Sequence, residues 1–442
     1  MNGLKTITCD VAIIGAGMAG MAAALYAANR GLNTIIMGAT NGATTFASGL
    51  LDLLGVYPVE QKKKRSDPWK GIAELIKECP SHPYAMVSQT SIQQAFSELI
   101  ESLQLEGLEY CGDSEKNLEV VTALGSSKPS YRIPRSMLAG SQALQKKRPC
   151  LLVDFHGMKE YSARQIASAL SKKWPNLRSA RIDFSETQIA SELYNTSMAE
   201  ALESAAVRAK IADTVLKIKK EDEVVGFPAI LGLRGAKKVF ADLQTRIGAP
   251  IFEIPTLPPS VPGLRLKEAF ESHLLKIGVR FLPFFYVSEA RETGAGGFEL
   301  TAEVEQSHSL VYSRGVILAT GRFLGKGLLA ERQVIREPIF NLPVCQPASR
   351  KNWHCEHFFD PKGHEVNRSG IEVDHLFRPV RKKETPAFQT LFAVGSILAH
   401  QDWARTKSGS GLAIATAYQA VNACRDALGK QRKPSLASSS AY

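Results

Sequence analysis

The sequence has few of the residues and spacings that bind metals or form disulfides. Its seven cysteines are scattered along 442 residues, and no two of them form a Cys-x-x-Cys pair. This pattern argues against a disulfide framework and against an iron–sulfur or zinc site, and it favours reduced thiols in the cytoplasm. We therefore predict no metal site, and we expect any electron transfer to use an organic cofactor.

Long hydrophobic segments are also scarce. Residues 11–28 carry no charge and are long enough to span a bilayer, but they contain three glycines and are followed by Asn29-Arg30-Gly31. This pattern favours a strand, a turn and a helix over a membrane span. The pair Cys9-Asp10 does not fit the apolar part of a secretory signal. We expect contact with a membrane only from its surface or through a partner.

Negative charge is in deficit. The chain has 54 Lys and Arg against 43 Asp and Glu, a net charge of +11, which favours anionic partners such as phosphorylated substrates, acidic subunits or an anionic membrane face. Zinc-finger spacings, aromatic-and-basic strand motifs and long basic helices are missing, so we do not expect nucleic acid as a partner. A content of 44% hydrophobic residues is typical of a globular protein, here with room for two or three packed units.

The most informative motif lies near the N-terminus. Val11–Ile14 predicts a short apolar strand, which runs into Gly15-x-Gly17-x-x-Gly20 and an alanine-rich helix. Gly15 allows a tight turn, Gly17 lets the backbone approach a phosphate, and Gly20 lets the helix pack against the strand. Phosphate oxygens can then bind the free amides at the helix N-terminus. The motif predicts a site for a nucleotide cofactor.

An acidic residue is missing from this motif. Dinucleotide folds carry an Asp or Glu about 20 residues further on, at the end of the second strand, to bind the ribose of the adenosine. Here the strand predicted at Asn33–Met37 ends in Gly38-Ala39-Thr40, and no acid occurs between Arg30 and Asp52. The cofactor is therefore either an FAD held by other contacts or a mononucleotide such as FMN.

The chain is predicted to fold as an α/β protein in which one domain is inserted into another. A charged run at Lys62–Arg65 and a proline-dense stretch at Ile254–Gly263 suggest the limits of the insertion. We expect a Rossmann-like flavin-binding domain, with a parallel sheet and a β-meander, and an α/β cap domain that covers the substrate. The expected flavin-binding parts are residues 1–60, 256–345 and 391–430, the cap is 61–255, a loop-rich connection is 346–390, and a flexible tail is 431–442.

Small and polar residues near predicted strand ends are candidates for binding the cofactor. Many flavoproteins place an Asp where Ser396 stands to bond a ribityl hydroxyl, which a serine does more weakly. The predicted helix Leu412–Leu428 would point its N-terminus at the flavin and stabilise the charge of the reduced ring, although Ser408 has the alternative role of a simple N-cap. The cofactor candidates are Gly15, Gly17, Gly20, Ser48, Gly49, Gly321, Gly395, Ser396, Ser408 and Gly409.

Several stretches carry a resemblance to a known family. Besides the glycine turn, they are Phe46–Leu54, Pro255–Leu266, Leu328–Arg332 with Ile335–Ile339, and Leu391–Ser396. Over nearly its full length the chain resembles the B-subunit of the anaerobic glycerol-3-phosphate dehydrogenase. The glycine turn is shared by flavoproteins in general, whereas the proline-rich and Arg-Glu-Pro stretches are much more specific.

This resemblance implies a flavin subunit that uses FMN and pairs with a larger FAD subunit and an iron–sulfur membrane-anchoring subunit. The complex would oxidise sn-glycerol 3-phosphate to dihydroxyacetone phosphate and pass electrons to a quinone. FMN is thus the first expectation and FAD the alternative. The protein is expected in the cytoplasm, held at the cytoplasmic membrane through its partners.

Such an oxidation needs a base for the hydroxyl proton and cations for the substrate phosphate. We predict His400 as the base and Arg265, Arg332 and Arg336 as phosphate ligands. The alternatives are a surface histidine and arginines in surface ion pairs, with the FAD subunit doing the chemistry while this chain relays electrons. Two rival functions are a self-sufficient FAD-dependent oxidoreductase of the fumarate-reductase type and a flavin-free assembly subunit.

Overall fold

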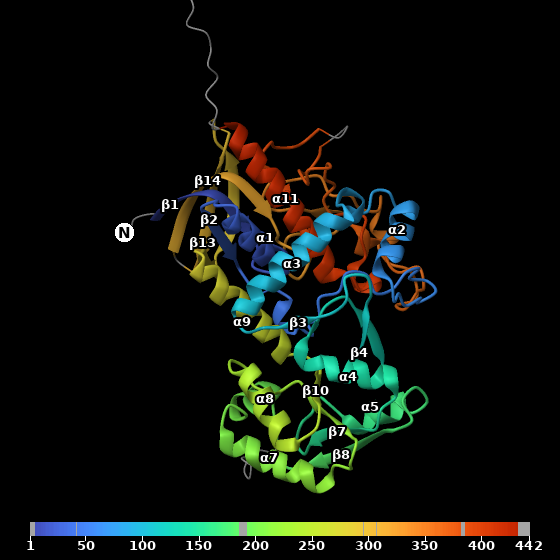
Figure 1. Ribbon diagram of the computed structural model, residues 1–442. Coiled ribbons are helices and arrows are strands. Elements are labelled where there is room, and N and C mark those ends of the chain that lie inside the picture. The colour runs from blue at the N-terminus through green and yellow to red at the C-terminus, as the bar shows by residue number, and fades with distance from the viewer. Residues whose placement is uncertain are drawn as a thin grey trace, which may run out of the picture.

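The computed structural model describes residues 5–40, 42–184, 192–294, 296–305, 307–381 and 385–431. Two lobes, each with its own sheet and hydrophobic core, make up this part of the chain (Figure 1). The first lobe contains both the N-terminal strand and the long C-terminal helix, and the second is built from the middle of the chain. Apart from Gln431, the tail expected at 431–442 lies outside the described residues.

A mixed seven-stranded sheet forms the centre of the first lobe. The strand order is β11-β2-β1-β14-β13-β12, and β17 also pairs with β14. Strands β11, β2, β1, β14 and β17 run parallel, while β13 and β12 extend the sheet as an antiparallel meander. The bounds are β1 Lys5–Ile14, β2 Thr34–Gly38, β11 Arg280–Pro283, β12 Tyr286–Glu292, β13 Phe298–Val304, β14 Ser307–Leu318 and β17 Leu391–Ala393.

The long strand β14 joins the parallel and antiparallel parts of the sheet, because the same edge of β14 pairs first with the antiparallel strand β13 and then with the parallel strand β17. Ser313 in its first part lies opposite Phe298 of β13, whereas Val316 near its end lies opposite Leu391 of β17. The carboxyl ends of β1, β14 and β17 therefore meet at one edge of the sheet. This arrangement confirms the predicted Rossmann-like domain with a β-meander.

Helices cover the first sheet and pack on one another. Tyr26 of α1 meets Tyr418 of α11 edge to face with ring centroids 5.2 Å apart, and the Arg30 guanidinium lies 4.8 Å from the centroid of the Tyr418 ring. The bounds are α1 Met18–Asn29, α2 Pro68–Glu78, α3 Gln89–Leu105, α9 Val261–Lys276, α10 Trp403–Thr406 and α11 Gly409–Gln431. Within the described ranges no helix is both long and apolar enough to cross a membrane, and residues 11–28 instead form the end of β1, a turn and most of α1.

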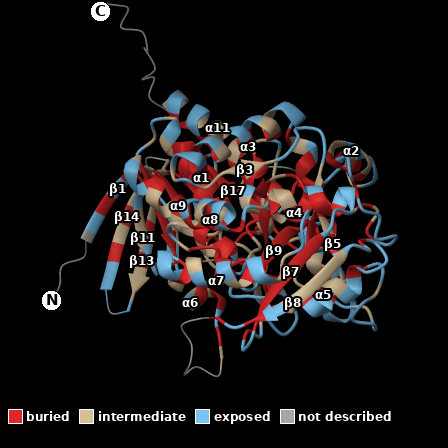
Figure 2. Cartoon of the chain, turned by 60° about the horizontal axis from the view of Figure 1, so that its bottom comes forward, coloured by how far each residue is buried: buried red, intermediate tan, exposed pale blue. Residues whose placement is uncertain are grey.

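The second lobe contains a parallel four-stranded sheet in the order β10-β9-β7-β8. All six residues of β7 are buried, which is typical of a parallel strand covered on both faces. Its strands are β7 Cys150–Phe155, β8 Leu177–Ile182, β9 Val224–Pro228 and β10 Ile251–Ile254. Its helices are α4 Arg135–Lys146, α5 Ala163–Leu170, α6 Asn195–Ala201, α7 Ala205–Ile218 and α8 Ala236–Ile247. The buried residues follow the two sheets and the inner sides of the helices (Figure 2).

The start of the second lobe differs from the expected cap boundary at residue 61. Ile72 of α2 and Ile92 and Leu99 of α3 belong to the first hydrophobic core, because their apolar faces pack on the first lobe. The described packing therefore assigns α2 and α3 to the first lobe. The short pairs β3 Tyr110–Cys111 with β6 Ile133–Pro134 and β4 Leu118–Val121 with β5 Ser127–Ser130 follow, and β15 Leu329–Ala330 pairs with β16 Ile335–Arg336 elsewhere.

Residues 195–218 of the second lobe form two helices, α6 and α7, in place of one. The helix breaks between α6 and α7, and the Arg208 guanidinium explains how. It donates hydrogen bonds to the backbone carbonyls of Leu202 at 2.8 Å and Glu203 at 2.9 Å. Carbonyl groups at the end of α6 are thus bonded to a side chain in place of further helical amides.

Candidate functional site

The turn between β1 and α1 has the close packing that the glycine motif predicts. Gly15 adopts a positive φ of 119°, and a Cβ there would lie 2.2 Å from the backbone oxygen of Ala319. A Cβ at Gly20 would lie 1.7 Å from the backbone oxygen of Gly15. Side chains cannot fit at either position, because the first turn of α1 lies directly on the ends of β1 and β14.

Gly17 differs from these two glycines. It is the N-cap of α1, no side chain caps the helix there, and no heavy atom lies within 4 Å of the position that its Cβ would occupy. The first amides of α1 are therefore approachable from one open side. A helix N-terminus of this kind, with a positive dipole end, is suited to binding a phosphate.

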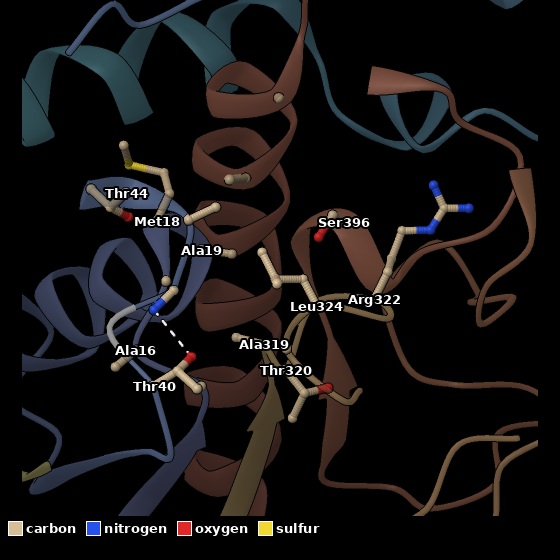
Figure 3. Close-up of a pocket in the computed structure, with 18 of the residues that line it drawn as sticks. Ala16, Met18, Ala19, Thr40, Thr44, Ala319, Thr320, Arg322, Leu324 and Ser396 are labelled. Carbon is tan, nitrogen blue, oxygen red and sulfur yellow. Dashed lines mark hydrogen bonds between the residues drawn. The ribbon is translucent and has the colours of Figure 1, made fainter. Parts of the chain in front are cut away.

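This open side faces a cavity of about 710 Å³, which we call the nucleotide cavity. It runs along the carboxyl edge of the first sheet, with Ala16 and Thr40 on one side and Ser396 and Arg322 on the other (Figure 3). The start of α11 also lines it, through Gly409 among other residues. One continuous cavity thus joins the glycine turn, the end of β2 and the last helix, as an extended cofactor requires.

The end of β2 lacks a carboxylate for a structural reason. A Cβ at Gly38 would lie 2.4 Å from the Cβ of Ala16, so a side chain at this position would collide with the glycine turn. The polar groups present are hydroxyls, since Thr40 and Thr44 both line the cavity. The Thr40 Oγ1 already accepts a hydrogen bond of 3.2 Å from the amide of Gly42 (Figure 3, dashed line).

Positive side chains dominate the charged lining of the nucleotide cavity. Lys128 comes from β5 and forms an ion pair with Asp52, a residue far from it in the sequence. Lys407 lines the same cavity, and desolvation followed by repulsion from Lys128 lowers its pKa. The charged residues among the described lining are Asp52, Lys128, Arg322, Lys326 and Lys407. Four cations against one anion make the cavity a site for anions.

Arg322 is a largely buried member of this set. One of its terminal nitrogens donates to the backbone oxygens of Val366 at 3.1 Å and Ser369 at 2.8 Å. Its Nε is buried and has no hydrogen-bond partner among the described residues. Burial lowers the pKa of Arg322 to about 10. The guanidinium is thus directed toward the segment 366–369 (Figure 3), and its Nε remains a buried donor without a partner among the described residues.

The loop that carries Asp52 is fixed to the start of α11 by hydrogen bonds. The amide of Asp52 donates to Ser410 Oγ at 2.6 Å, and the amide of Gly411 donates to the backbone oxygen of Asp52 at 2.6 Å. Ser410 and Asp52 both line the cavity. Sequence reasoning did not select Asp52, Lys128, Lys407 or Ser410, because only folding brings these distant segments together.

The predicted cofactor residues fall into two groups. Those that line the nucleotide cavity are Gly15, Gly17, Ser48, Gly321, Ser396 and Gly409. Those that lie behind its wall are Gly20, Gly49, Gly395 and Ser408. Residues of the second group contact other parts of the protein. A Cβ at Gly49 would lie 2.7 Å from Pro262, and the Ser408 hydroxyl shares a 2.8 Å hydrogen bond with Thr406.

The structure does not bring the predicted base and phosphate ligands into the nucleotide cavity. His400 lines a second cavity, where its Nε2 lies 2.8 Å from Glu372. Arg265 is buried and binds both carboxylate oxygens of Glu253, at 2.7 and 2.9 Å. Arg336 pairs with Glu331 at 3.1 Å, and Arg332 is exposed; neither lines the nucleotide cavity. None of the four predicted residues therefore lines the nucleotide cavity, because spacing along the chain does not reveal which carboxylate each cation faces; their roles stay predictions.

The fold and the nucleotide cavity define a flavoprotein. The chain matches the family of FAD binding domains over residues 10–412. It is 30% identical over 436 residues to the probable B-subunit of the anaerobic glycerol-3-phosphate dehydrogenase of Halobacterium salinarum, covering 96% of this chain and 99% of that one. It is 28% identical over 422 residues to the B-subunit of the same enzyme in Vibrio vulnificus, covering 93% and 95%. The chain belongs to the family of B-subunits of the anaerobic glycerol-3-phosphate dehydrogenase.

Solved structures give weaker similarity. A flavocytochrome c3 fumarate reductase in an open conformation matches 96% of this chain and 78% of its own, with 9% identity and a TM-score of 0.41. That similarity is too low to carry an argument. The family match also corrects the first expectation for the cofactor: it indicates FAD binding, so FMN as the main choice is not supported.

Proposed function

We propose that the chain is the flavin-binding subunit of a glycerol-3-phosphate dehydrogenase, with FAD in the nucleotide cavity and the substrate phosphate at the cations that line it. The observation that carries the proposal is the set of four cations that line a cavity beginning at a dinucleotide-type glycine turn. A cofactor diphosphate and a substrate phosphate are both anions. The relatives' names support glycerol 3-phosphate as the substrate.

FAD fits the residues that are present. The glycine turn leaves the amides of α1 open for the diphosphate, and the cavity continues past Thr40 and Thr44, where a dinucleotide fold holds its adenosine. Hydroxyls and backbone groups would bind the ribose in place of a carboxylate. At the other end, the first turn of α11 lies against the cavity, where its dipole favours negative charge on a reduced flavin. When bound, FAD supplies the hydride acceptor.

Lys128 and Lys407 are the proposed phosphate ligands. They are close enough for the charge of one to lower the pKa of the other, so a dianion between them relieves their repulsion. Asp52 pairs with Lys128 and sets its direction. Because Lys128 and Lys407 come from distant parts of the chain, a phosphate bound between them would link β5 to the segment before α11. We assign no catalytic role to His400, which lines the other cavity.

The electrons are proposed to leave through partner subunits to a quinone at the membrane. The relatives are named as one lettered subunit of their enzyme, which supports a multisubunit complex. The resemblance further implies an FAD subunit and an iron–sulfur subunit as those partners, with this chain held at the cytoplasmic membrane through them.

Releasing the cofactor tests the first half of the proposal. The purified full-length chain is heated, and the supernatant is separated by chromatography against FAD and FMN standards. We expect FAD, in a ratio near one per chain. FMN would overturn the cofactor assignment, and a colourless protein that takes up neither flavin would support an assembly subunit.

A substrate titration tests the second half. Glycerol 3-phosphate is added to the flavin-loaded chain, and the change in the flavin absorbance gives the affinity. Lys128→Gln and Lys407→Gln are each expected to weaken binding by tenfold or more, since a hydrogen bond to a charged group contributes about 1.5–3 kcal/mol. Lys116→Gln, an exposed lysine outside the cavity, is the matched control. Unchanged affinity in both variants, with flavin retained, would overturn the phosphate site; tighter binding of a dicarboxylate would favour the fumarate-reductase alternative.

A further inference from the structure

The structure contains a second cavity, of about 650 Å³, with the opposite charge. We call it the acidic cavity, because one arginine, Arg368, faces four carboxylates among its described lining residues. Those carboxylates belong to Glu60, Glu78, Glu365 and Asp402. A cavity of this composition attracts cations. His400 and Cys345 also line it, and neither has a role in the proposed function.

Three potential metal ligands converge beside the acidic cavity: Cys345 and His400 line it, and the exposed Glu372 lies next to them. The Cys345 thiol, a carboxylate oxygen of Glu372 and a ring nitrogen of His400 all lie within 4.8 Å of one another. The His400 Nε2 is 2.8 Å from Glu372 Oε1, and the thiol is also hydrogen-bonded to that carboxylate, which together with burial raises the thiol pKa. A thiol, an imidazole and a carboxylate are the three ligand types that bind Zn²⁺ in proteins.

The backbone fixes the positions of these three side chains. Cys345 exchanges two backbone hydrogen bonds with Gly370, of 2.8 and 3.0 Å, and Ile371 pairs with the segment 397–399 in the same way. Cys345 thus lies in an antiparallel bridge to Gly370, and Glu372 and His400 follow the two partners of a parallel bridge, Ile371 with the segment 397–399. His400 has a positive φ of 62°, and its amide donates to the backbone oxygen of Arg368 at 2.9 Å. A left-handed histidine is uncommon and marks a position where the surroundings dictate the backbone.

An independent polar group faces the same cavity. His82 is 1% exposed, and its Nδ1 accepts a hydrogen bond of 3.1 Å from the amide of Tyr84, so its Nε2 carries the hydrogen. That Nε2 is buried without a hydrogen-bond partner among the described residues. A buried donor with no acceptor is costly, and a water or hydroxide ligand in the cavity would satisfy it.

We propose that Cys345, Glu372 and His400 bind a divalent cation of the zinc class, with a fourth position open to the acidic cavity. The charges balance: a thiolate and a carboxylate neutralise the two positive charges of the ion, and the imidazole binds as a neutral ligand. On binding, the thiol releases its proton to solvent and the sulfur–metal bond replaces its hydrogen bond to Glu372. Three protein ligands with one open position are typical of zinc sites that exchange a ligand. This site runs against the prediction of no metal, because its ligands are far apart in the sequence.

Metal content and spectroscopy test the site directly. The flavin-loaded full-length chain is treated with a chelator, incubated with Zn²⁺ and passed through a desalting column, and bound zinc is measured by mass spectrometry. We expect one zinc per chain, and at least a tenfold loss of affinity in Cys345→Ser and His400→Ala. Cys111→Ser and His156→Ala, which change a cysteine and a histidine outside the acidic cavity, are the controls and should bind zinc normally.

Cobalt distinguishes this site from others in the chain. With Co²⁺ as the probe, the wild type should show a thiolate-to-cobalt charge-transfer band in the near ultraviolet that Cys345→Ser loses. Zinc retained by Cys345→Ser would assign the metal elsewhere, for example to the loop with His354 and His364, and would overturn the proposal. Should the variant fail to fold, alkylation of the wild type decides: Zn²⁺ must protect Cys345 and leave Cys111 reactive, and equal labelling of Cys345 with and without Zn²⁺ contradicts the site.

Discussion

The two cavities have similar size and opposite chemistry. The nucleotide cavity, of about 710 Å³, has four cations against one carboxylate, and the acidic cavity, of about 650 Å³, has four carboxylates against one arginine. Asp402 lines the acidic cavity, and the next residue, Trp403, lines the nucleotide cavity. A single short segment thus separates a site for anions from a site for cations.

The two cavities also differ in what shapes them. Small residues bring backbone amides close to a ligand in the nucleotide cavity, so its ligand is recognised by the main chain and by surrounding charge. At the acidic cavity the proposed metal ligands are side chains, and backbone hydrogen bonds between three segments fix their positions. The first cavity was therefore visible as a sequence motif, whereas the second emerges only when residues 345, 372 and 400 are folded together.

Gly20→Ala is expected to have the largest effect on stability and flavin binding. It disrupts the nucleotide cavity and leaves the acidic cavity unchanged. Its Cβ would lie 1.7 Å from the backbone oxygen of Gly15, so α1 must move off the sheet, at a cost of about 4 kcal/mol or more. Gly17→Ala is the matched control, since nothing lies within 4 Å of its Cβ. It should fold normally and bind flavin on the order of tenfold less tightly, a loss of about 1.4 kcal/mol. Urea unfolding and flavin titration measure both effects; equal stability of the two variants would contradict the described turn.

Arg265→Met is expected to have the next largest effect, and it tests whether cations outside the two cavities are structural. Removing one partner of a buried ion pair costs about 3–5 kcal/mol, whereas Arg336→Met breaks an exposed pair worth about 1 kcal/mol or less. Burial alone would raise the pKa of Glu253, but Arg265 outweighs it and holds that pKa below its usual value of 4.5.

The sign of the pH dependence follows from that lowered pKa. The unfolded chain takes up the Glu253 proton first, so the contribution of the pair is complete above pH 4.5 and is lost as the pH falls through the lower folded value. Arg265→Met should therefore remove part of the acid sensitivity of the urea midpoint. A variant that keeps full stability but binds glycerol 3-phosphate weakly would restore Arg265 as a phosphate ligand.

The fold was predictable from local signals wherever those signals agreed. The apolar strand, glycine turn and alanine-rich helix became β1 and α1, and the predicted helix 412–428 lies within α11. The missing acid at the end of β2 was also visible, but its cause was not: Gly38 must be small because Ala16 packs on it. That absence alone left FAD and FMN open; the expectation of FMN came from the family resemblance, and the match to the FAD binding domain does not support it.

The site residues were harder to predict because charge pairing is a tertiary property. Arg265 looked like a free cation in the sequence, yet Glu253 lies twelve residues earlier on the neighbouring β10 and neutralises it. Lys128 carries no motif that marks it in the sequence, yet it forms an ion pair with the distant Asp52. Sequence spacing identifies backbone sites well and does not identify which side chains meet.

His82→Asn tests the acidic cavity through pH. Burial, and then the charge of His400, lower the pKa of His82 to about 3 from its ordinary 6.5. The unfolded chain therefore takes up a proton below pH 6.5 that the folded chain refuses, and stability falls as the pH drops, by up to about 1.4 kcal/mol per unit. An asparagine keeps an acceptor for the amide of Tyr84 without titrating. The variant should flatten the fall in unfolding free energy between pH 6.5 and pH 4, and the exposed-histidine control His156→Asn should not.

The smallest expected effects distinguish residues that line the nucleotide cavity from residues that lie behind the lining. Ser396 lines the cavity, so Ser396→Ala should weaken flavin binding by the value of one hydrogen bond, about 0.5–1.5 kcal/mol, and leave the flavin-free protein equally stable. Ser408, just before α11, is 1% exposed and shares a hydrogen bond with Thr406 of α10, so Ser408→Ala should lower the stability of the flavin-free protein by about 1 kcal/mol and leave flavin affinity unchanged. Flavin titration and urea unfolding of the flavin-free variants distinguish the two. If both variants lose affinity alike, the ligand reaches deeper than the described wall, and the first turn of α11 contacts the flavin through its side chains as well as its amides.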